Sequence, residues 1–177
     1  AKPIPVLPFD DLTLALPKPS VPARDEIPNG HSEAGLLYTS GTTGRPKGCV
    51  VTNEYFHFWG QWFLSRGHTL ALKEGEERLY NPLPLHHANA LSISLPTMLL
   101  AGGCLVFPDR FHASTFWDDI VNCKVTAIQF QGVIPAILLK LPETAQERSH
   151  KVKFALCASC EPSLHQEFER RYDFPLV

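Results

Sequence analysis

Residues 38–48 combine hydroxyl side chains, glycines and a lysine in a pattern that suits a phosphate group. Glycine lets backbone N–H groups approach an anion closely, and hydroxyls add hydrogen-bond donors or bind a metal. The Lys47 ammonium supplies a mobile positive charge of the kind that binds phosphate. We therefore predict a loop able to hold the phosphates of a nucleoside triphosphate, formed by Thr39, Ser40, Gly41, Thr42, Thr43, Gly44 and Lys47.

This loop differs from the P-loop of the common NTPases, in which a lysine and a Ser or Thr run directly into a helix. Here Lys47 lies between Pro46 and Gly48, and the β-branched residues that follow are typical of a strand. We expect the phosphates to lie on a loop between two strands, with no helix dipole beneath them. A kinase or P-loop NTPase is therefore disfavoured. The length of the run also disfavours a plain turn rich in Gly, Ser and Thr.

Residues 36–47, Leu-Leu-Tyr-Thr-Ser-Gly-Thr-Thr-Gly-Arg-Pro-Lys, resemble the phosphate-binding motif of the adenylate-forming (AMP-binding) superfamily. That superfamily includes acyl-CoA synthetases, the adenylation domains of peptide synthetases and luciferases. Its members convert ATP and a carboxylic acid into an acyl adenylate and pyrophosphate, and an acceptor, usually coenzyme A, then takes the acyl group as a thioester. The resemblance implies ATP, a carboxylic acid and coenzyme A as partners, Mg²⁺ as cofactor, and Thr39 as a candidate magnesium ligand.

Residues 81–91 resemble the second core motif of the same enzymes. The resemblance places His87 beside the substrate carboxylate as the candidate catalytic residue, and puts His86 where an aromatic residue is more usual. Taken alone, two adjacent histidines could also be a structural histidine or a metal pair, although neighbours on an extended chain point to opposite sides. Residues 125–135, by themselves an ordinary strand and helix, resemble the segment that lines the acyl pocket. The implied pocket residues are His86, His87, Asn89, Phe130 and Gly132.

A third stretch, residues 158–162, resembles a glycine-rich loop that contacts adenine in this superfamily. The resemblance implies that Ser159, Cys160 and Glu161 lie on the adenine side of the nucleotide. Ser159 and Cys160 occupy positions at which glycine-like residues are usual, so this stretch departs from the family pattern.

The elements that must position these motifs alternate along the chain. Strand-like runs cover residues 35–39, 49–52, 78–81, 104–107, 125–130 and 154–156, and helices are predicted after the caps Asn53 and Ser114 and over residues 90–100, 136–141 and 163–172. Pro96 is expected to kink or break its helix. The alternation predicts an α/β fold with a mostly parallel sheet flanked by helices. Residues 1–33, which are rich in proline, are predicted to form an extended strap, and residues 34–177 a partial AMP-binding domain.

The composition excludes several classes of protein. The 16 Lys and Arg nearly balance the 18 Asp and Glu, so the sequence does not indicate binding to nucleic acid through a basic face. No apolar run approaches the roughly 20 residues of a transmembrane helix. The five cysteines are odd in number and widely spaced, which favours free thiols in a reducing compartment and hence the cytoplasm. Cys157 and Cys160 could form a redox pair or half a zinc site, but no second pair at finger spacing accompanies them.

The resemblance leads us to expect that the Tyr-Gly-x-Thr-Glu motif of the superfamily, the C-terminal domain that carries its catalytic lysine, and an upstream piece lie outside these residues. We therefore expect an internal fragment of the large N-terminal domain, whose parent is an acid–thiol ligase and which is inactive, or nearly so, when isolated. The alternative is a non-catalytic folded fragment or a pseudo-enzyme. The sequence leaves open which acid is used and whether the acceptor is coenzyme A or a carrier protein.

Overall fold

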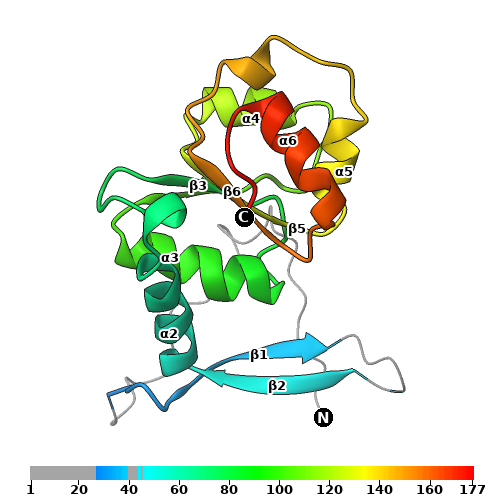
Figure 1. The fold of residues 1–177 in the computed structure, drawn as a ribbon. Coiled ribbons are helices and arrows are strands. Elements are labelled where there is room, and N and C mark those ends of the chain that lie inside the picture. Colours follow the sequence, from blue (N-terminus) through cyan, green and yellow to red (C-terminus); the bar gives the residue numbers. More distant parts are fainter. Residues whose placement is uncertain (1–26, 40–43, 45) are drawn as a thin grey trace, which may run out of the picture.

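The computed structural model describes residues 27–39, 44 and 46–177. The predictions for residues 1–26 and for Ser40, Gly41, Thr42 and Thr43 lie outside the described residues. The described part contains a two-stranded antiparallel sheet and a four-stranded parallel sheet with helices on both of its faces (Figure 1). The predicted α/β fold with a mostly parallel sheet is therefore confirmed.

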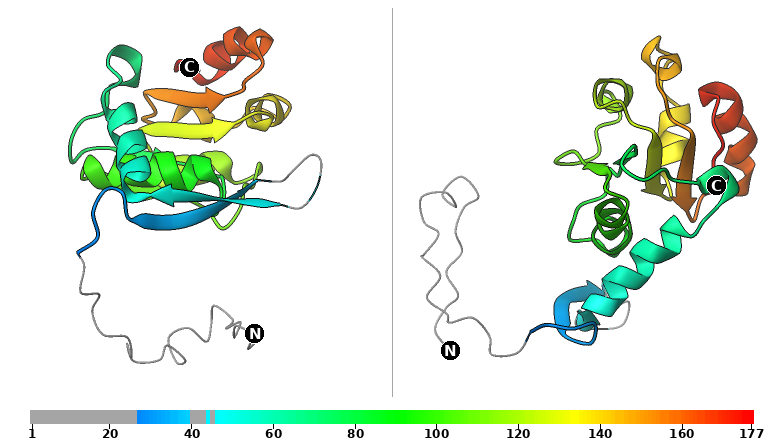
Figure 2. Two further views of the ribbon diagram at one scale, coloured as in Figure 1. Left: turned by 90° about the horizontal axis from the view of Figure 1, so that it is seen from below. Right: turned by 90° about the vertical axis from the view of Figure 1, so that its left-hand side faces the viewer.

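The first two strands form a hairpin outside the parallel sheet. β1 (Glu33–Thr39) pairs antiparallel with β2 (Lys47–Thr52), and the register sets Leu37 opposite Cys49 and Thr39 opposite Lys47. The hairpin leads into α2 (Asn53–Leu64), which runs from it toward the parallel sheet (Figure 2).

The cap of α2 is one residue earlier than the sequence predicts. Thr52 has an extended backbone, and its Oγ1 accepts a hydrogen bond from Tyr55 N at 3.4 Å. Asn53 is the first residue of the helix, and its Nδ2 donates to Asn29 O at 2.9 Å. The prediction of Asn53 as the cap was wrong. Its side chain is used in the long-range hydrogen bond to Asn29, and Thr52 instead accepts from a free backbone N–H of the first helical turn.

The parallel sheet has the strand order β4–β3–β5–β6. Its strands are β3 (Arg78–Tyr80), β4 (Cys104–Val106), β5 (Ala127–Gln131) and β6 (Phe154–Ala158). The C-terminal residues extend the edge beyond β6, where Ala155 N donates to Pro175 O at 2.9 Å and Cys157 N donates to Val177 O at 2.8 Å. The strand order reverses between β3 and β5, which is where open α/β sheets bind ligands.

The helices agree with the sequence in number and order but not at every end. Residues 90–100 divide into a π-helix, η3 (Asn89–Ser94), and α3 (Leu95–Leu100), with Pro96 in the first turn of α3. Proline has no N–H to donate to the preceding turn, and the break expected at Pro96 takes the form of a change from π- to α-helix, with Ser94 and Leu95 both in helical conformation. The cap of α4 (Phe116–Asn122) is Thr115 rather than Ser114, and no side-chain hydrogen bond caps it. The remaining helices are α5 (Ile134–Leu139) and α6 (His165–Tyr172), with short 3₁₀ turns η2 (His68–Leu70), η4 (Gln146–Arg148) and η5 (Pro162–Leu164).

Alternate residues of the parallel strands face two separate cores. Tyr80 and Ile128 pack on the face covered by α4, α5 and α6, whereas Leu79, Ala127 and Phe154 pack with residues of α2 and α3 on the other face (Figure 1). The sheet is therefore the middle layer of three. In the described part of the chain, no helix is long and apolar enough to cross a membrane.

The contact between α2 and α3 depends on a glycine. A Cβ at Gly60 would lie 2.7 Å from Leu100 Cδ1 and 3.0 Å from the carbonyl carbon of Pro96. The absence of a side chain at Gly60 thus lets the two helices approach closely beneath the sheet.

At the amino-terminal edge of the parallel sheet, one buried carboxylate ties three strands together. Glu77, just before β3, accepts hydrogen bonds from Lys73 N at 2.8 Å and Thr126 Oγ1 at 2.5 Å, and it pairs with Lys153 Nζ. Thr126 precedes β5, and Lys153 precedes β6. Burial opposes the charge of Glu77, but the hydrogen bonds from Lys153 and Thr126 outweigh it and hold the pKa of Glu77 below its usual range.

We expect Glu77→Gln to lower the free energy of unfolding at neutral pH by about 2 kcal/mol. The pKa of Glu77 in the folded state lies below its ordinary value of 4.5. The Glu77 carboxylate therefore contributes fully to the free energy of unfolding above pH 4.5, and this contribution is lost as the pH falls through the lowered pKa. Urea unfolding at a series of acid pH values should therefore show that the free energy of unfolding depends less on pH in Glu77→Gln than in wild type. The control is Glu76→Gln, whose ion pair with Lys73 is exposed to solvent. Equal acid sensitivity of Glu77→Gln and wild type would contradict this assignment.

Candidate functional site

The hairpin register brings together the two ends of the predicted phosphate loop. Thr39, the last residue of β1, is the register partner of Lys47, the first residue of β2. Lys47 is exposed, and β2 rather than a helix follows it, as the sequence predicts. Gly44 is exposed, and no described residue lies within 4 Å of where its Cβ would be. The described residues therefore place an exposed lysine side chain at one end of the predicted loop.

A hollow of about 530 Å³ connects the hairpin to the second motif. Residues of β1, β2 and α2 line it together with Ala88, which directly follows His87. The lining residues are Leu37, Tyr38, Cys49, Val50, Val51, Thr52, Tyr55 and Ala88. The hollow therefore lies between the strands that flank the phosphate loop and the residue that follows His87, although none of the described predicted site residues lines it.

The paired histidines follow β3 in a turn at the carboxyl end of the sheet. His86 and His87 are both exposed, and His87 N donates to Pro84 O at 2.9 Å. The His87 ring accepts a hydrogen bond at Nδ1 from Asn89 N, with the two nitrogens 3.2 Å apart. With Nδ1 as acceptor, neutral His87 carries its proton on Nε2. Among the residues that the structure describes, no group of three or more His, Cys, Asp and Glu could hold a metal ion.

Beneath this turn lies a buried polar network that the sequence analysis missed. Asn81 Nδ2 donates to Asn89 Oδ1 at 2.8 Å and to Ser94 Oγ at 2.7 Å, and Ser94 Oγ donates to Gln129 Oε1 at 2.5 Å. The register that pairs Tyr80 with Ile128 places Asn81 beside Gln129, where the strand order reverses. A glutamine inside an apolar strand was the available signal, because a buried polar side chain needs a partner.

The predicted acyl-pocket residues within residues 125–135 occupy two environments. Phe130 is wholly buried, and its ring packs edge-on against Phe168 of α6, with the ring centres 6.1 Å apart. Gly132 has φ of +56°, which favours glycine, and its N donates to Ala158 O at 3.0 Å. This hydrogen bond joins the loop after β5 to the end of β6. Contact of Phe130 or Gly132 with an acyl group stays a prediction.

The predicted adenine-side residues lie just beyond this junction. Ser159 has φ of +61°, a left-handed conformation that costs a residue with a Cβ about 1–2 kcal/mol. The strain explains physically why a glycine-like residue suits the position. Ser159 and Glu161 are exposed and Cys160 is half-buried, and their contact with adenine stays a prediction.

One cysteine of this segment, Cys157, does not have the character of a reactive thiolate. The five cysteines are free thiols. Burial, followed by the neighbouring Cys160, raises the pKa of Cys157 to about 12, so this thiol stays protonated at neutral pH. The structure therefore favours a packing role for Cys157.

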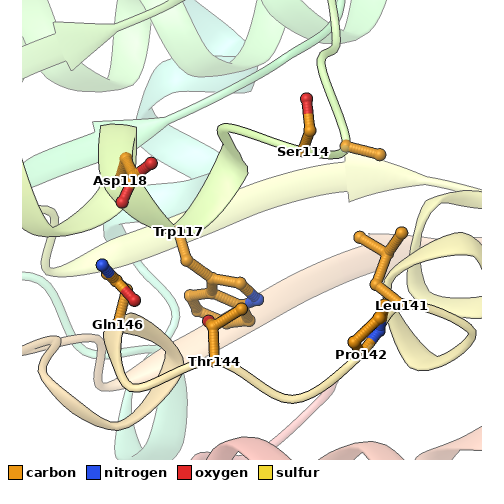
Figure 3. Close-up of a pocket in the computed structure, with 8 residues that line it drawn as sticks. Ser114, Trp117, Asp118, Leu141, Pro142, Thr144 and Gln146 are labelled. Carbon is orange, nitrogen blue, oxygen red and sulfur yellow. The ribbon is translucent and has the colours of Figure 1, made fainter.

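A second hollow, of about 390 Å³, lies between the start of α4 and the segment after α5. The Trp117 indole lies among its side chains, with Ser114 and Asp118 on one side and Leu141, Pro142, Thr144 and Gln146 on the other (Figure 3). None of the predicted site residues lines it, and those that the structure describes lie at the ends of the hairpin strands and after the carboxyl ends of β3, β5 and β6.

Proteins similar to this chain include fatty acid transport proteins and fatty-acid–CoA ligases. The chain is 32% identical over 165 residues to a very long-chain fatty acid transport protein of Cochliobolus heterostrophus, which covers 89% of this chain and 25% of that protein. It is 32% identical over 151 residues to the medium/long-chain-fatty-acid–CoA ligase FadD6 of Mycobacterium tuberculosis, with coverage of 85% and 25%. The chain thus spans about a quarter of the length of the curated relatives it matches.

Among solved structures, the O-succinylbenzoate coenzyme A synthetase of Bacillus subtilis in complex with AMP is similar, with a TM-score of 0.70 at 30% identity. The similarity covers 84% of this chain and 30% of that one. The same enzyme has been solved in complex with ATP and magnesium ion. Residues 5–177, which include most of the predicted strap and every predicted site residue, match the model of the family described as AMP-binding enzyme. The chain therefore belongs to the AMP-binding enzyme family.

Proposed function

We propose that this chain supplies the phosphate loop and the acid-side histidine of an acid–thiol ligase. The observation that carries the proposal is the shared hollow, which joins the hairpin bearing Thr39 and Lys47 to the segment that follows His87. In this function ATP and a carboxylic acid form an acyl adenylate and pyrophosphate, and coenzyme A then takes the acyl group as a thioester.

The chemistry accounts for the residue types. A carboxylate is a poor electrophile, and its conversion to an acyl adenylate provides AMP as a good leaving group. Lys47 and the loop from Thr39 to Gly44 hold the β- and γ-phosphates and neutralise charge as pyrophosphate leaves. Mg²⁺, when bound, supplies further charge neutralisation, and Thr39 is the candidate ligand, since magnesium prefers oxygen donors and phosphate. The exposed Lys47 is compatible with such a ligand.

We further propose a fatty acid of medium to very long chain as the substrate. The support comes from two relatives, a very long-chain fatty acid transport protein and a medium/long-chain-fatty-acid–CoA ligase. His86, Asn89, Phe130 and Gly132 are proposed to lie along the acyl side, and Ser159, Cys160 and Glu161 along the adenine side. The free thiols suit work in the cytoplasm.

The test is ATP–pyrophosphate exchange by the full-length protein with a panel of fatty acids of increasing length and with O-succinylbenzoate. We expect exchange that needs both magnesium and a fatty acid, and coenzyme A thioester as the final product. Residues 1–177 alone are expected to show little or no exchange. ATP binding by calorimetry without exchange for any acid would contradict the proposed reaction. Absence of ATP binding would favour the alternative, a non-catalytic module.

A further inference from the structure

The buried polar network connects the middle of the sheet to the candidate catalytic histidine without a break. Gln129 on β5 accepts from Ser94, and Ser94 accepts from Asn81, which follows β3. Asn81 also donates to the side chain of Asn89, and Asn89 N donates to the ring of His87. Four hydrogen bonds thus join five residues, which come from β5, the segment after β3, the π-helix and the turn that carries His87, and the series ends at His87 Nδ1.

Asn81 is the centre of this network. Its side chain is fully buried, and both hydrogens of its Nδ2 are used by Asn89 and Ser94. Its Oδ1 accepts from Leu83 N at 2.9 Å, at the start of the turn that carries the histidines. A buried amide with three hydrogen bonds cannot rotate without leaving a polar group unpaired, which costs about 1–3 kcal/mol. Asn81 therefore holds both the turn and the π-helix in a single arrangement.

The π-helix gives this arrangement its local geometry. π-Helices are rare and are frequently found at functional sites. Here η3 begins at Asn89, two residues after His87, and His87 O accepts from Leu91 N at 3.0 Å. The backbone N–H of Asn89, as the first of the helix, has no acceptor within it, and it donates to the histidine ring instead.

We propose that Asn81 is the positioning residue of His87. Through Asn89 it fixes the ring with Nδ1 as acceptor and leaves the Nε2–H free to donate to the carboxylate of the acid. This inference rests on the proposed function, because it assigns Asn81 a role in the step at which the acid is bound and activated. Misplacement of a reacting group by about 1 Å can cost about 10²-fold in rate, so loss of Asn81 should affect the acid far more than ATP.

The first experiment compares Asn81→Ala and Ser94→Ala in full-length protein by ATP–pyrophosphate exchange. We expect Asn81→Ala to lower kcat/KM for the acid by about 10- to 100-fold and to leave KM for ATP within about twofold. Ser94→Ala, which removes one hydroxyl and favours the helix, should fold and show a smaller loss in the same parameter. The matched control is Thr97→Val, at an equally buried position whose hydroxyl donates to the backbone, at Ile93 O one turn earlier, and to no side chain of the network. Equal losses for the control and Asn81→Ala would overturn the proposal.

A double-mutant cycle separates positioning from general structural support. If Asn81 acts through His87, Asn81→Ala should have little further effect on kcat/KM for the acid in a His87→Ala background. Additive losses would show that Asn81 does not act through the histidine. A protein that shows no exchange with any acid would contradict the proposed function instead.

A second measurement tests the connection from Asn81 through Asn89 to His87 without an activity assay. Amide hydrogen exchange at Asn89 reports the hydrogen bond to His87 Nδ1, and we expect it to be about tenfold faster in Asn81→Ala than in wild type. Thr97→Val should leave the exchange rate unchanged. A protected Asn89 amide in Asn81→Ala would overturn the proposal even if the protein is an active ligase.

Discussion

Replacement of Lys47 by alanine is expected to lower kcat/KM for ATP in the full-length protein by about 10²-fold, measured by ATP–pyrophosphate exchange. Lys47 begins β2 opposite Thr39, so its side chain is held at the mouth of the loop although it is exposed to solvent. Without the Lys47 ammonium, the negative charge of the β- and γ-phosphates is less well neutralised, both when ATP binds and when pyrophosphate leaves. Lys47→Arg retains the positive charge and should retain part of the activity, since a guanidinium binds phosphate with a different geometry.

Lys151→Ala provides the matched control for this prediction. Lys151 is also exposed but lies in the segment before β6, far along the chain from the loop. Its loss should change kcat/KM for ATP by less than about twofold. Unchanged ATP affinity and turnover in Lys47→Ala would reject the assignment of the phosphate loop.

Replacement of Arg171 by alanine is expected to lower the free energy of unfolding by about 3–5 kcal/mol. Arg171 in α6 donates from Nε and Nη2 to the Glu147 carboxylate at 3.2 and 2.9 Å, and from Nη1 to Leu139 O at 2.9 Å. The hydrogen bond from Arg171 to Glu147 raises the pKa of the guanidinium further. Because the Glu147 side chain is only 2% exposed, loss of its partner would leave a buried carboxylate unpaired.

The neighbouring Arg170 supplies the control for this stability measurement. It lies in the same helix and is exposed, so Arg170→Ala should change the free energy of unfolding by less than about 0.5 kcal/mol. The double variant Glu147→Leu/Arg171→Met should recover much of the loss, because apolar residues of similar size need no partner. Urea unfolding that shows equal effects for Arg170→Ala and Arg171→Ala would contradict a structural role for the ion pair.

Local sequence patterns were sufficient for the type and order of the elements. The strand predicted at residues 154–156 is part of β6 (Phe154–Ala158), and the strand predicted at residues 125–130 overlaps β5 (Ala127–Gln131). The run at residues 125–130 is rich in β-branched and aromatic residues and the run at residues 154–156 is apolar, and these patterns are independent of the remainder of the chain. The break at Pro96 was equally local, because the missing N–H is a property of proline itself.

The helix cap at Thr52, the π-helix and the buried polar network were not predicted, because each depends on more than the local sequence. Asn53 is a good cap in isolation, but Asn29 takes up its side chain and Thr52 caps α2 instead. The π-helix at Asn89 was predicted as ordinary helix because its residues carry no local signature of a wider turn. Asn81 and Ser94 were overlooked for the same reason, since each is a common polar residue until its partner is known.

By itself, the sequence predicted the chemistry of the chain, a candidate phosphate loop that ends in Lys47 and a candidate catalytic histidine at position 87, and it determined that strands alternate with helices. Motifs of this kind depend on residue type and on spacing over a few positions. Only the tertiary structure decided that Thr39 faces Lys47 across an antiparallel hairpin, and that Asn81 links Gln129 to the turn that carries His87. These arrangements depend on hydrogen bonds between residues as far as 35 positions apart, which leave no periodic trace in the sequence.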